Sequence, residues 1–381
     1  MTPDSRSPSL RDSAVEPSVA TARSAAFRRL TGTPARAVAI PDLAGERCVH
    51  ARIETARCRA CVEACPRGAW IIDDERVGID TEACDGCDVC VPACPEGAII
   101  SARPRDAEIR SWRGRPAVFR ACERAGVSAE AGVIPCVHSI GLTDLLRLYR
   151  RGVRDWIVSA APCESCPRGT APRFQEAIHQ AQTLLSSREL PPLTLTVLEP
   201  QRWSATANQA APYLEDAAVN RRGFFRKALR VAVDTAMETA GAPDTRAPFA
   251  PAATWLPETG PNAVQLYQPA IDPQRCNGCD ACARLCPHQA IALERLPTAL
   301  QYRLDGQRCT GCGICQDACD QNAASVIALR PQQTRAVPLL ERRCPACGTP
   351  YHQPAAHPSS AEFCRICTRT RRTRLLFQTL D

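Results

Sequence analysis

Twenty-four cysteines carry most of the chemistry that this chain of 381 residues could do. Their most regular arrangement is Cys276-x2-Cys279-x2-Cys282-x3-Cys286-Pro287, and the same spacing returns from Cys309 to Cys319. Three thiolates spaced in this way can bind one face of an iron–sulfur cube, and the fourth points away to ligate a neighbouring cube. The two runs are therefore predicted to exchange their fourth cysteines. The resulting ligand sets are Cys276, Cys279, Cys282 and Cys319 (set 3) and Cys309, Cys312, Cys315 and Cys286 (set 4).

A second pair of cysteine runs lies upstream, and its first run is irregular. Thr55 stands where the spacing requires a first cysteine, and Cys48 is the candidate replacement, supplied from a longer loop. If Cys48 does not ligate, the first cluster becomes a labile site with three cysteines. The predicted sets are Cys48, Cys58, Cys61 and Cys94 (set 1) and Cys84, Cys87, Cys90 and Cys65 (set 2).

The residues after each fourth cysteine indicate an internal repeat. A Pro-x-x-Ala-apolar pattern follows Cys65, Cys94 and Cys286, and a copy without Pro follows Cys319. Each unit predicts a cluster loop, a helical turn and a short strand. Small Ala and Gly residues would let backbone N–H groups reach the sulfurs, and such hydrogen bonds raise a cluster's potential. The runs resemble the bacterial dicluster ferredoxins, most clearly over residues 270–330, and this resemblance implies four [4Fe–4S] clusters.

Residues 113–200 alternate apolar runs with amphipathic ones, which predicts a small parallel α/β domain of the flavodoxin-like kind. The expected strands and helices are 117–119, 132–134, 142–151, 155–158, 173–187 and 193–197. Four cysteines fall at the ends of the predicted strands, where the loops of a parallel sheet converge, so they could hold one more cluster. These are Cys122, Cys136, Cys163 and Cys166 (the central quartet).

Other interpretations of the central quartet stay open. The thiols could be unliganded core residues, or Cys163 and Cys166 could form a redox-active dithiol. His138 is near enough to Cys136 in sequence to replace a ligand, although a lone His is more often a surface or packing residue.

The same segment resembles the small iron–sulfur (delta) subunit of heterodisulfide-reductase-linked hydrogenases. The resemblance implies a [2Fe–2S] cluster and electron transfer between larger subunits. Members often begin with a Cys-x2-Cys pair, whereas Cys122 stands alone here, so [2Fe–2S] and [4Fe–4S] both remain open. The matching residues are Ala121-Cys122-Glu123, Pro135-Cys136-Val137, the stretch 152–158 and Pro162-Cys163-Glu164-Ser165-Cys166.

Two Cys-x2-Cys knuckles near the C-terminus predict a structural zinc site of the zinc-ribbon kind. Mononuclear iron, bound as in rubredoxin, is the alternative to zinc. The two histidines of this segment, His352 and His357, are expected to lie in loops. The knuckles are Cys344, Cys347, Cys364 and Cys367 (the C-terminal quartet). The basic residues Arg365, Arg369, Arg371, Arg372 and Arg374 follow as a solvated charge run, or as a docking surface for an acidic redox partner or a nucleic acid.

Composition narrows the class of protein. The net charge is +7, and Lys227 is the one lysine, so almost all basic residues are arginines. Such an imbalance is better explained by the coding bias of a GC-rich genome than by selection for phosphate binding. No secretory signal or membrane-spanning run is expected, and a chain so rich in cysteine without one points to the reducing cytoplasm. Arg221–Lys227 looks like a twin-arginine export signal but lies mid-chain, so a structural helix is expected there.

The predicted fold class is therefore α+β and multidomain. Its parts are a disordered lead (1–45), two dicluster ferredoxin domains (46–112 and 269–332), the α/β domain (113–200), a linker with a helix (201–268) and the zinc-ribbon-like module with its basic tail (340–381). Because no nucleophile elbow, phosphate loop or nicotinamide fingerprint is present, we expect electron transfer rather than catalysis. The expected partner is a larger redox enzyme: a molybdopterin oxidoreductase, a hydrogenase or a heterodisulfide-reductase-like complex. An iron–sulfur cluster carrier and a redox-sensing regulator are the alternatives.

Overall fold

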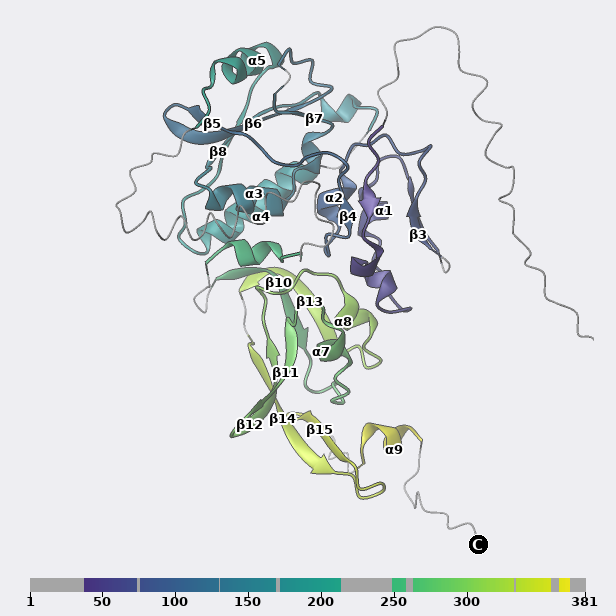
Figure 1. Ribbon diagram of the computed structural model, residues 1–381. Helices are drawn as coiled ribbons and strands as arrows, with labels where there is room; N and C mark the ends of the chain where they lie inside the picture. Colours follow the sequence, from purple (N-terminus) through teal and green to yellow (C-terminus); the bar gives the residue numbers. More distant parts are fainter. Residues whose placement is uncertain are drawn as a thin grey trace, which may run out of the picture. The chain divides into compact units, whose positions relative to one another are not determined.

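A computed structural model of the chain (Figure 1) describes residues 38–73, 76–129, 131–168, 172–213, 249–257, 263–331, 334–357 and 363–370. The twin-arginine-like segment, most of the predicted lead and Arg371, Arg372 and Arg374 lie outside the described residues. From Val38 onward the chain forms one compact unit.

The central part of the chain contains a twisted sheet of mostly parallel strands. β7, β8 and β9 run parallel to β6, in the spatial order β7-β6-β8-β9, while β5 pairs with the first half of β6 in the antiparallel sense. This order is the one that flavodoxin-like sheets adopt. The strands are β5 (Ile109–Trp112), β6 (Arg115–Cys122), β7 (Val133–Ile134), β8 (Asp155–Ser159) and β9 (Thr194–Val197).

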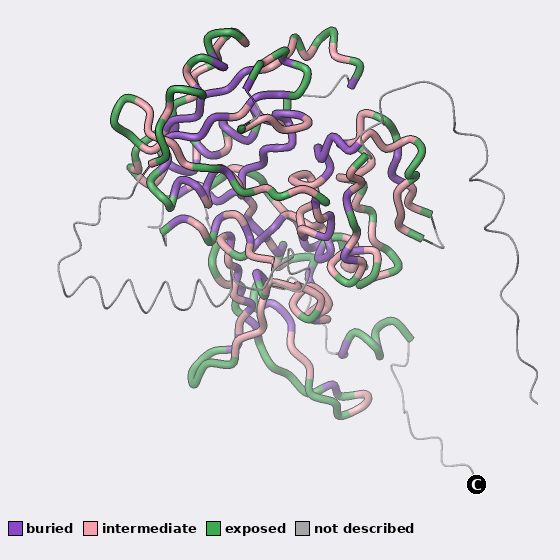
Figure 2. Tube along the Cα trace, turned by 45° about the horizontal axis from the view of Figure 1, so that its top comes forward, coloured by how far each residue is buried: buried purple, intermediate pink, exposed green. Residues whose placement is uncertain are grey.

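Helices cover both faces of this sheet (Figure 1), so the central region has three layers. α3 (Leu142–Arg150) and α4 (Arg173–Ser186) pack on one face and α5 (Pro200–Gln209) on the other. The apolar face predicted for α3 is buried, and the backbone N–H of Gly141 donates to Asp144 at the helix start. On the opposite face, the indole N–H of Trp203 donates to the carbonyl of Ile157 at 3.0 Å. Every residue of β8 is buried, and Figure 2 shows the buried segments gathered in the sheet.

Two smaller regions carry the regular cysteine runs. The upstream region pairs β1 with β4 and β2 with β3, both antiparallel. The downstream region pairs β10 with β13 along their whole length, and a second sheet runs β11-β12-β14-β15. The upstream elements are β1 (Asp42–Leu43), α1 (Ala60–Ala64), β2 (Trp70–Ile72), β3 (Val77–Ile79), α2 (Cys90–Ala93) and β4 (Ile99–Ile100). The downstream elements are β10 (Val264–Ile271), α7 (Ala281–Leu285), β11 (Ile291–Leu296), β12 (Ala299–Leu304), α8 (Ile314–Asp317), β13 (Ala324–Pro331), β14 (Ala336–Arg343), β15 (Pro350–Pro354) and α9 (Arg365–Arg369).

Several elements cross the boundaries expected from the sequence. β5 precedes residue 113 yet pairs with β6, and α5 falls in the expected linker yet packs on the central sheet. β10 likewise starts inside the expected linker, and β14 joins the knuckle module to β12 of the dicluster region. The sequence shows local periodicity but not which strands pair, so boundaries drawn from it missed these contacts.

No helix among the described residues is long and apolar enough to cross a membrane.

Candidate metal centres

The regular cysteine runs form loops whose backbone enters the left-handed region twice. The first such residue is the glycine two positions after the first cysteine, and its N–H donates to that cysteine's sulfur. A residue with a Cβ is strained at these angles, which explains the glycine. The φ values are 66° at Gly86, 73° at Gly278 and 79° at Gly311, then 60° at Asp88, 63° at Asp280 and 82° at Gly313 after the second cysteine.

The fourth cysteine of every run makes one further N–H···S hydrogen bond. The residue three positions after this cysteine has a positive φ, and the resulting turn points the N–H of the following residue back at the sulfur. That following residue is an alanine in all four runs, and its nitrogen lies 3.1–3.3 Å from the sulfur. These alanines are at most 4 % exposed, so a larger side chain would not fit. The pairs are Ala69 with Cys65, Ala98 with Cys94, Ala290 with Cys286 and Ala323 with Cys319. The Pro-x-x-Ala pattern thus has a structural cause, and the donors suit anionic cluster ligands.

The predicted ligand sets are brought together across the two runs of each pair. The four cysteines of set 1 line one cavity, those of set 2 a second and those of set 3 a third. In set 4, burial and, to a smaller extent, the charges of the other cysteines of the set raise the pKa of Cys309 and Cys315 to about 12. The exchange of fourth cysteines therefore has a geometric basis in both regions.

Cys48, the uncertain member of set 1, lies at the cavity that the other three cysteines line. It sits between two short 3₁₀ turns, Gly45–Arg47 and Val49–Ala51. The ring of His50 contacts the carbonyl of Cys58 at 2.8 Å and ties the Cys48 loop to the rest of the set. Thr55 instead donates its hydroxyl to the carbonyl of Asp317, away from this cavity.

These thiols are hard to ionise without a metal. Burial raises the pKa of Cys61, Cys87 and Cys90 to about 12. Ligation requires the thiolate, so iron binding must displace protons from buried sulfurs. Buried sulfurs surrounded by backbone donors fit iron–sulfur clusters, which are anionic and gain from N–H···S bonds.

The central quartet lies at the carboxyl ends of adjacent parallel strands, as a site on such a sheet requires. Cys122 ends β6, Cys136 follows β7, Cys163 begins the 3₁₀ turn after β8, and Cys166 directly follows that turn. Burial raises the pKa of Cys136 to about 11, and Cys122 and Cys163 contribute to this rise.

His138 is buried, and both of its ring nitrogens make polar contacts. Its ring is buried, and Nδ1 accepts the backbone N–H of Phe174 at 3.3 Å, in the first turn of α4. Nε2 must then carry the proton and donate to Cys163 Sγ at 3.2 Å. A donor on a ligand sulfur raises the potential of the cluster that the sulfur binds.

The central quartet adjoins set 2. Cys136 packs with Cys87 and Val89 in one buried cluster. Arg168, which is 5 % exposed, bridges the two sites through its guanidinium: Nε to Asp85 at 2.8 Å and Nη2 to Glu123 at 2.8 Å. Desolvation opposes the charge of Arg168, but the hydrogen bonds to both carboxylates raise its pKa above the usual value. Arg168 could not be singled out from the sequence, because its partners lie far away along the chain.

Set 1 adjoins set 4 through Glu96, two residues after Cys94. This carboxylate is 3 % exposed and accepts from the hydroxyl of Thr310 at 2.6 Å, while its other oxygen contacts His288 at 3.0 Å. Thr310 follows Cys309, a member of set 4.

A second contact between the two dicluster regions runs from Arg57 to Asp317. The backbone N–H of Arg57 donates to Asp317 at 2.9 Å and its guanidinium at 3.1 Å. Arg57 precedes Cys58 of set 1, and Asp317 lies in α8 beside Cys315 of set 4. Neither this contact nor the one at Glu96 is predictable from the sequence, because the residues that meet lie more than 200 positions apart.

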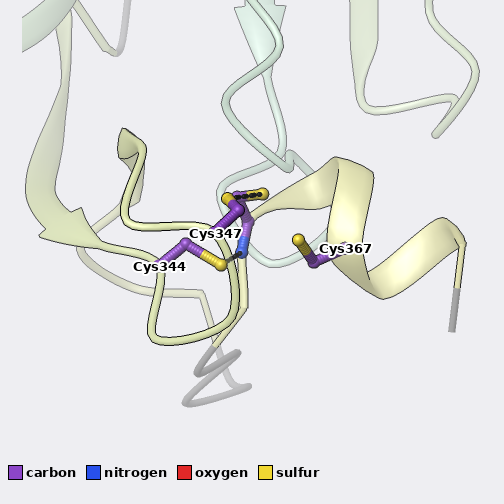
Figure 3. Close-up of side chains that lie close together, drawn as sticks. Cys344, Cys347 and Cys367 are labelled. Carbon is purple, nitrogen blue, oxygen red and sulfur yellow. Dashed lines mark hydrogen bonds between the residues drawn. The ribbon is translucent and has the colours of Figure 1, made fainter. Parts of the chain in front are cut away.

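The C-terminal quartet has the geometry of a site for one ion. Its four sulfur atoms all lie within 4.8 Å of one another, and Figure 3 shows Cys344, Cys347 and Cys367 turned toward a common centre. Four sulfurs about 2.3 Å from one ion at tetrahedral angles lie about 3.8 Å apart; Cys347 and Cys364 are 3.7 Å apart. Although desolvation opposes it, backbone N–H groups of Cys364 and Cys347 lower the pKa of Cys344 to about 6, whereas desolvation and the other three sulfurs raise the pKa of Cys367 to about 12, so Cys344 is the favoured thiolate of the quartet.

Comparison with known proteins identifies the two cysteine-rich regions. Residues 56–99 and 275–324 each match the family model of the 4Fe-4S dicluster domain. Together they span about a quarter of the chain, and the first match begins after Cys48. No curated protein matches the chain. The chain thus contains two dicluster domains of the ferredoxin type, which supports a role in iron–sulfur electron transfer.

Proposed function

We propose that this protein is a polyferredoxin that relays single electrons to or from a larger oxidoreductase. Sets 1 to 4 would each hold a [4Fe–4S] cluster, the central quartet a [2Fe–2S] or [4Fe–4S] cluster, and the C-terminal quartet a zinc ion. The clusters supply the redox chemistry, and the protein sets their spacing, burial and hydrogen bonding.

The observation that carries this proposal is that the ligand loops of successive sets touch. Cys136 of the central quartet packs on Cys87 of set 2. The helix α1 contains Cys61 of set 1 and ends at Cys65 of set 2. Glu96 connects set 1 to set 4, and α7 contains Cys282 of set 3 and ends at Cys286 of set 4. The relay order is therefore central quartet, set 2, set 1, set 4, set 3.

The partner would dock near the central quartet, at one end of this order. That domain resembles the delta subunit of hydrogenases linked to heterodisulfide reductase, so a hydrogenase, a heterodisulfide-reductase-like complex or a molybdopterin oxidoreductase is the partner we propose. A nucleic-acid partner is disfavoured because Arg365 of the basic tail donates to the carbonyl of Cys279 within the chain. We place the protein in the cytoplasm, where thiols stay reduced.

The first test is the metal content of protein purified without oxygen. Four cubes and a two-iron cluster require about 18 iron atoms, five cubes about 20, and an empty central quartet about 16. One zinc should accompany the iron. Zinc without iron in the dicluster regions would refute the relay.

The order is tested by electron paramagnetic resonance (EPR) of the fully reduced protein, in which neighbouring clusters broaden each other's signals. Cys61→Ala removes set 1 from the middle of the order, and Cys163→Ala removes a terminal site as the matched control. We expect the first variant to split the coupled spins into two groups. The control should leave the four cubes coupled. Coupling between the remaining cubes that is unchanged in Cys61→Ala would contradict the order.

A further inference from the structure

The knuckle module lies directly on the loop that carries the first two cysteines of set 3. Gly278, between Cys276 and Cys279, has φ 73°, and a Cβ added to it would overlap the carbonyl oxygen of His352 in β15. The backbone of Gln353 lies against the same position. Strand and loop are therefore so close that no side chain fits between them.

A buried carboxylate fastens the next turn of this loop to the same strand. Asp280 follows Cys279, has φ 63° and is 8 % exposed. Its Oδ1 accepts from the hydroxyl of Tyr302 in β12 at 2.7 Å and contacts Nε2 of His352 at 2.8 Å. His352 was expected in a loop; it belongs to a strand and faces this carboxylate.

The second knuckle also contacts this loop. Arg365, the residue after Cys364, donates from Nη1 to the carbonyl of Cys279 at 3.0 Å. α9 has five residues, and a helix so short is not stable alone. Its position depends on Cys364 and Cys367, which the ion would join to Cys344 and Cys347 on the β15 side.

In the other regular cysteine loops, a different part of the chain lies against the glycine that corresponds to Gly278. The equivalent glycine of set 4, Gly311, lies against the ring of Tyr267 in β10, and that of set 2, Gly86, against the carbonyl of Ala39. Each loop is covered by another element. For set 3 that element is the strand between the two knuckles.

We propose that the C-terminal quartet holds a redox-silent zinc ion whose task is to clamp the Cys276–Cys279 loop, with His352 and Arg365 as positioning residues. This inference rests on the proposed assignment of set 3 to one cluster. Binding of the ion fixes β15 relative to α9, and the two together fix the loop. The module is then a metal-dependent clamp on one cluster rather than a docking surface for another macromolecule.

The test uses the full chain, loaded and purified without oxygen. Cys364→Ser removes one ligand of the ion, and Arg365→Ala removes the contact with Cys279 while leaving the quartet intact. Arg369→Ala, in the same helix, is the matched control, and Arg365→Lys tests rescue. Zinc and iron contents, the EPR spectrum of the reduced protein and the rate of iron release to a chelator are measured for each.

We expect Cys364→Ser to lose the zinc and to release the iron of one cube at least tenfold faster, with the other cubes unaffected. Arg365→Ala should keep its zinc but change the EPR signal and the potential of that same cube. Arg365→Lys should restore them in part, and Arg369→Ala should match the unmodified protein. Loss of zinc with all EPR signals and iron release unchanged would overturn the clamp, as would one extra iron in place of zinc.

A failure of the underlying assignment gives a different result. Cys276→Ala should remove one cube. If this variant keeps all of its iron and its EPR spectrum, set 3 does not hold a cluster and the proposed relay fails, whatever the knuckle variants do.

Discussion

The charge of Glu96 should lower the potential of the set 4 cluster, and Glu96→Gln tests this directly. The carboxylate is buried between the two dicluster domains, and its charge raises the pKa of both Cys309 and Cys312, after the larger effect of burial. A charge that opposes ionisation of these thiols also opposes the extra electron of a reduced cluster. Glutamine keeps an oxygen that can accept from Thr310 and removes the charge.

The magnitude follows from the position of the carboxylate. Glu96 bonds Thr310, the neighbour of Cys309, which puts it about two residue spacings, roughly 8 Å, from the cluster. Coulomb's law at that distance gives about 2 kcal/mol for an effective dielectric constant of about 20. For a one-electron couple this is roughly 90 mV. The potential of the set 4 cube should therefore rise by up to about 90 mV, less where His288 offsets the charge. Because Glu96 also lines the set 1 cavity, the potential of the set 1 cube should rise as well.

The assay is a redox titration of the anaerobic protein followed by EPR. Thr310→Val is the matched control, because it removes the hydrogen bond at 2.6 Å and leaves the charge. Its potential should move little, and its stability should fall by about 1–3 kcal/mol because one oxygen of a buried carboxylate loses its donor. A shift below about 20 mV in Glu96→Gln, or a lower potential, would refute the electrostatic argument.

Three further outcomes are expected. Cys48→Ala, which leaves no ligating atom, should lose about four iron atoms and one EPR signal; unchanged iron content would exclude Cys48 as a ligand. His138→Leu removes the donor on Cys163 Sγ, so the central cluster's potential should fall by roughly 40 mV, the equivalent of one hydrogen bond of about 1 kcal/mol; a titration that shows no fall argues against that bond. Gly68→Ala, where a Cβ meets open space at φ 60°, should cost about 1–2 kcal/mol in stability. Gly97→Ala, where a Cβ overlaps an aromatic ring, should cost about 1–3 kcal/mol more. Equal unfolding midpoints for the two alanine variants would contradict that difference.

The spacing of residues in the sequence predicted those features of the structure that depend on residues close together in the chain. A cysteine loop, the glycine inside it and the alanine four residues after the last cysteine all act over a few residues, so their pattern is visible in the chain itself. The helix at Leu142–Arg150 and the strand at Asp155–Ser159 lie where periodicity predicts them for the same reason. The helix α5 was not predicted because it has few apolar residues, too few to form a clear helical pattern in the sequence. In the structure these residues cover one face of the central sheet.

The sequence by itself determined the kinds of site and the cysteines proposed to ligate in each. Only the tertiary structure decided which sites are neighbours. The contacts that decide this join Glu96 to Thr310, Arg168 to Asp85 and Asp280 to His352, residues 214, 83 and 72 positions apart. In each pair at least one member is buried, and nothing in the local sequence distinguishes these residues from other polar residues. They gain their roles because burial removes water and leaves each charged or polar group dependent on the few partners that the fold supplies.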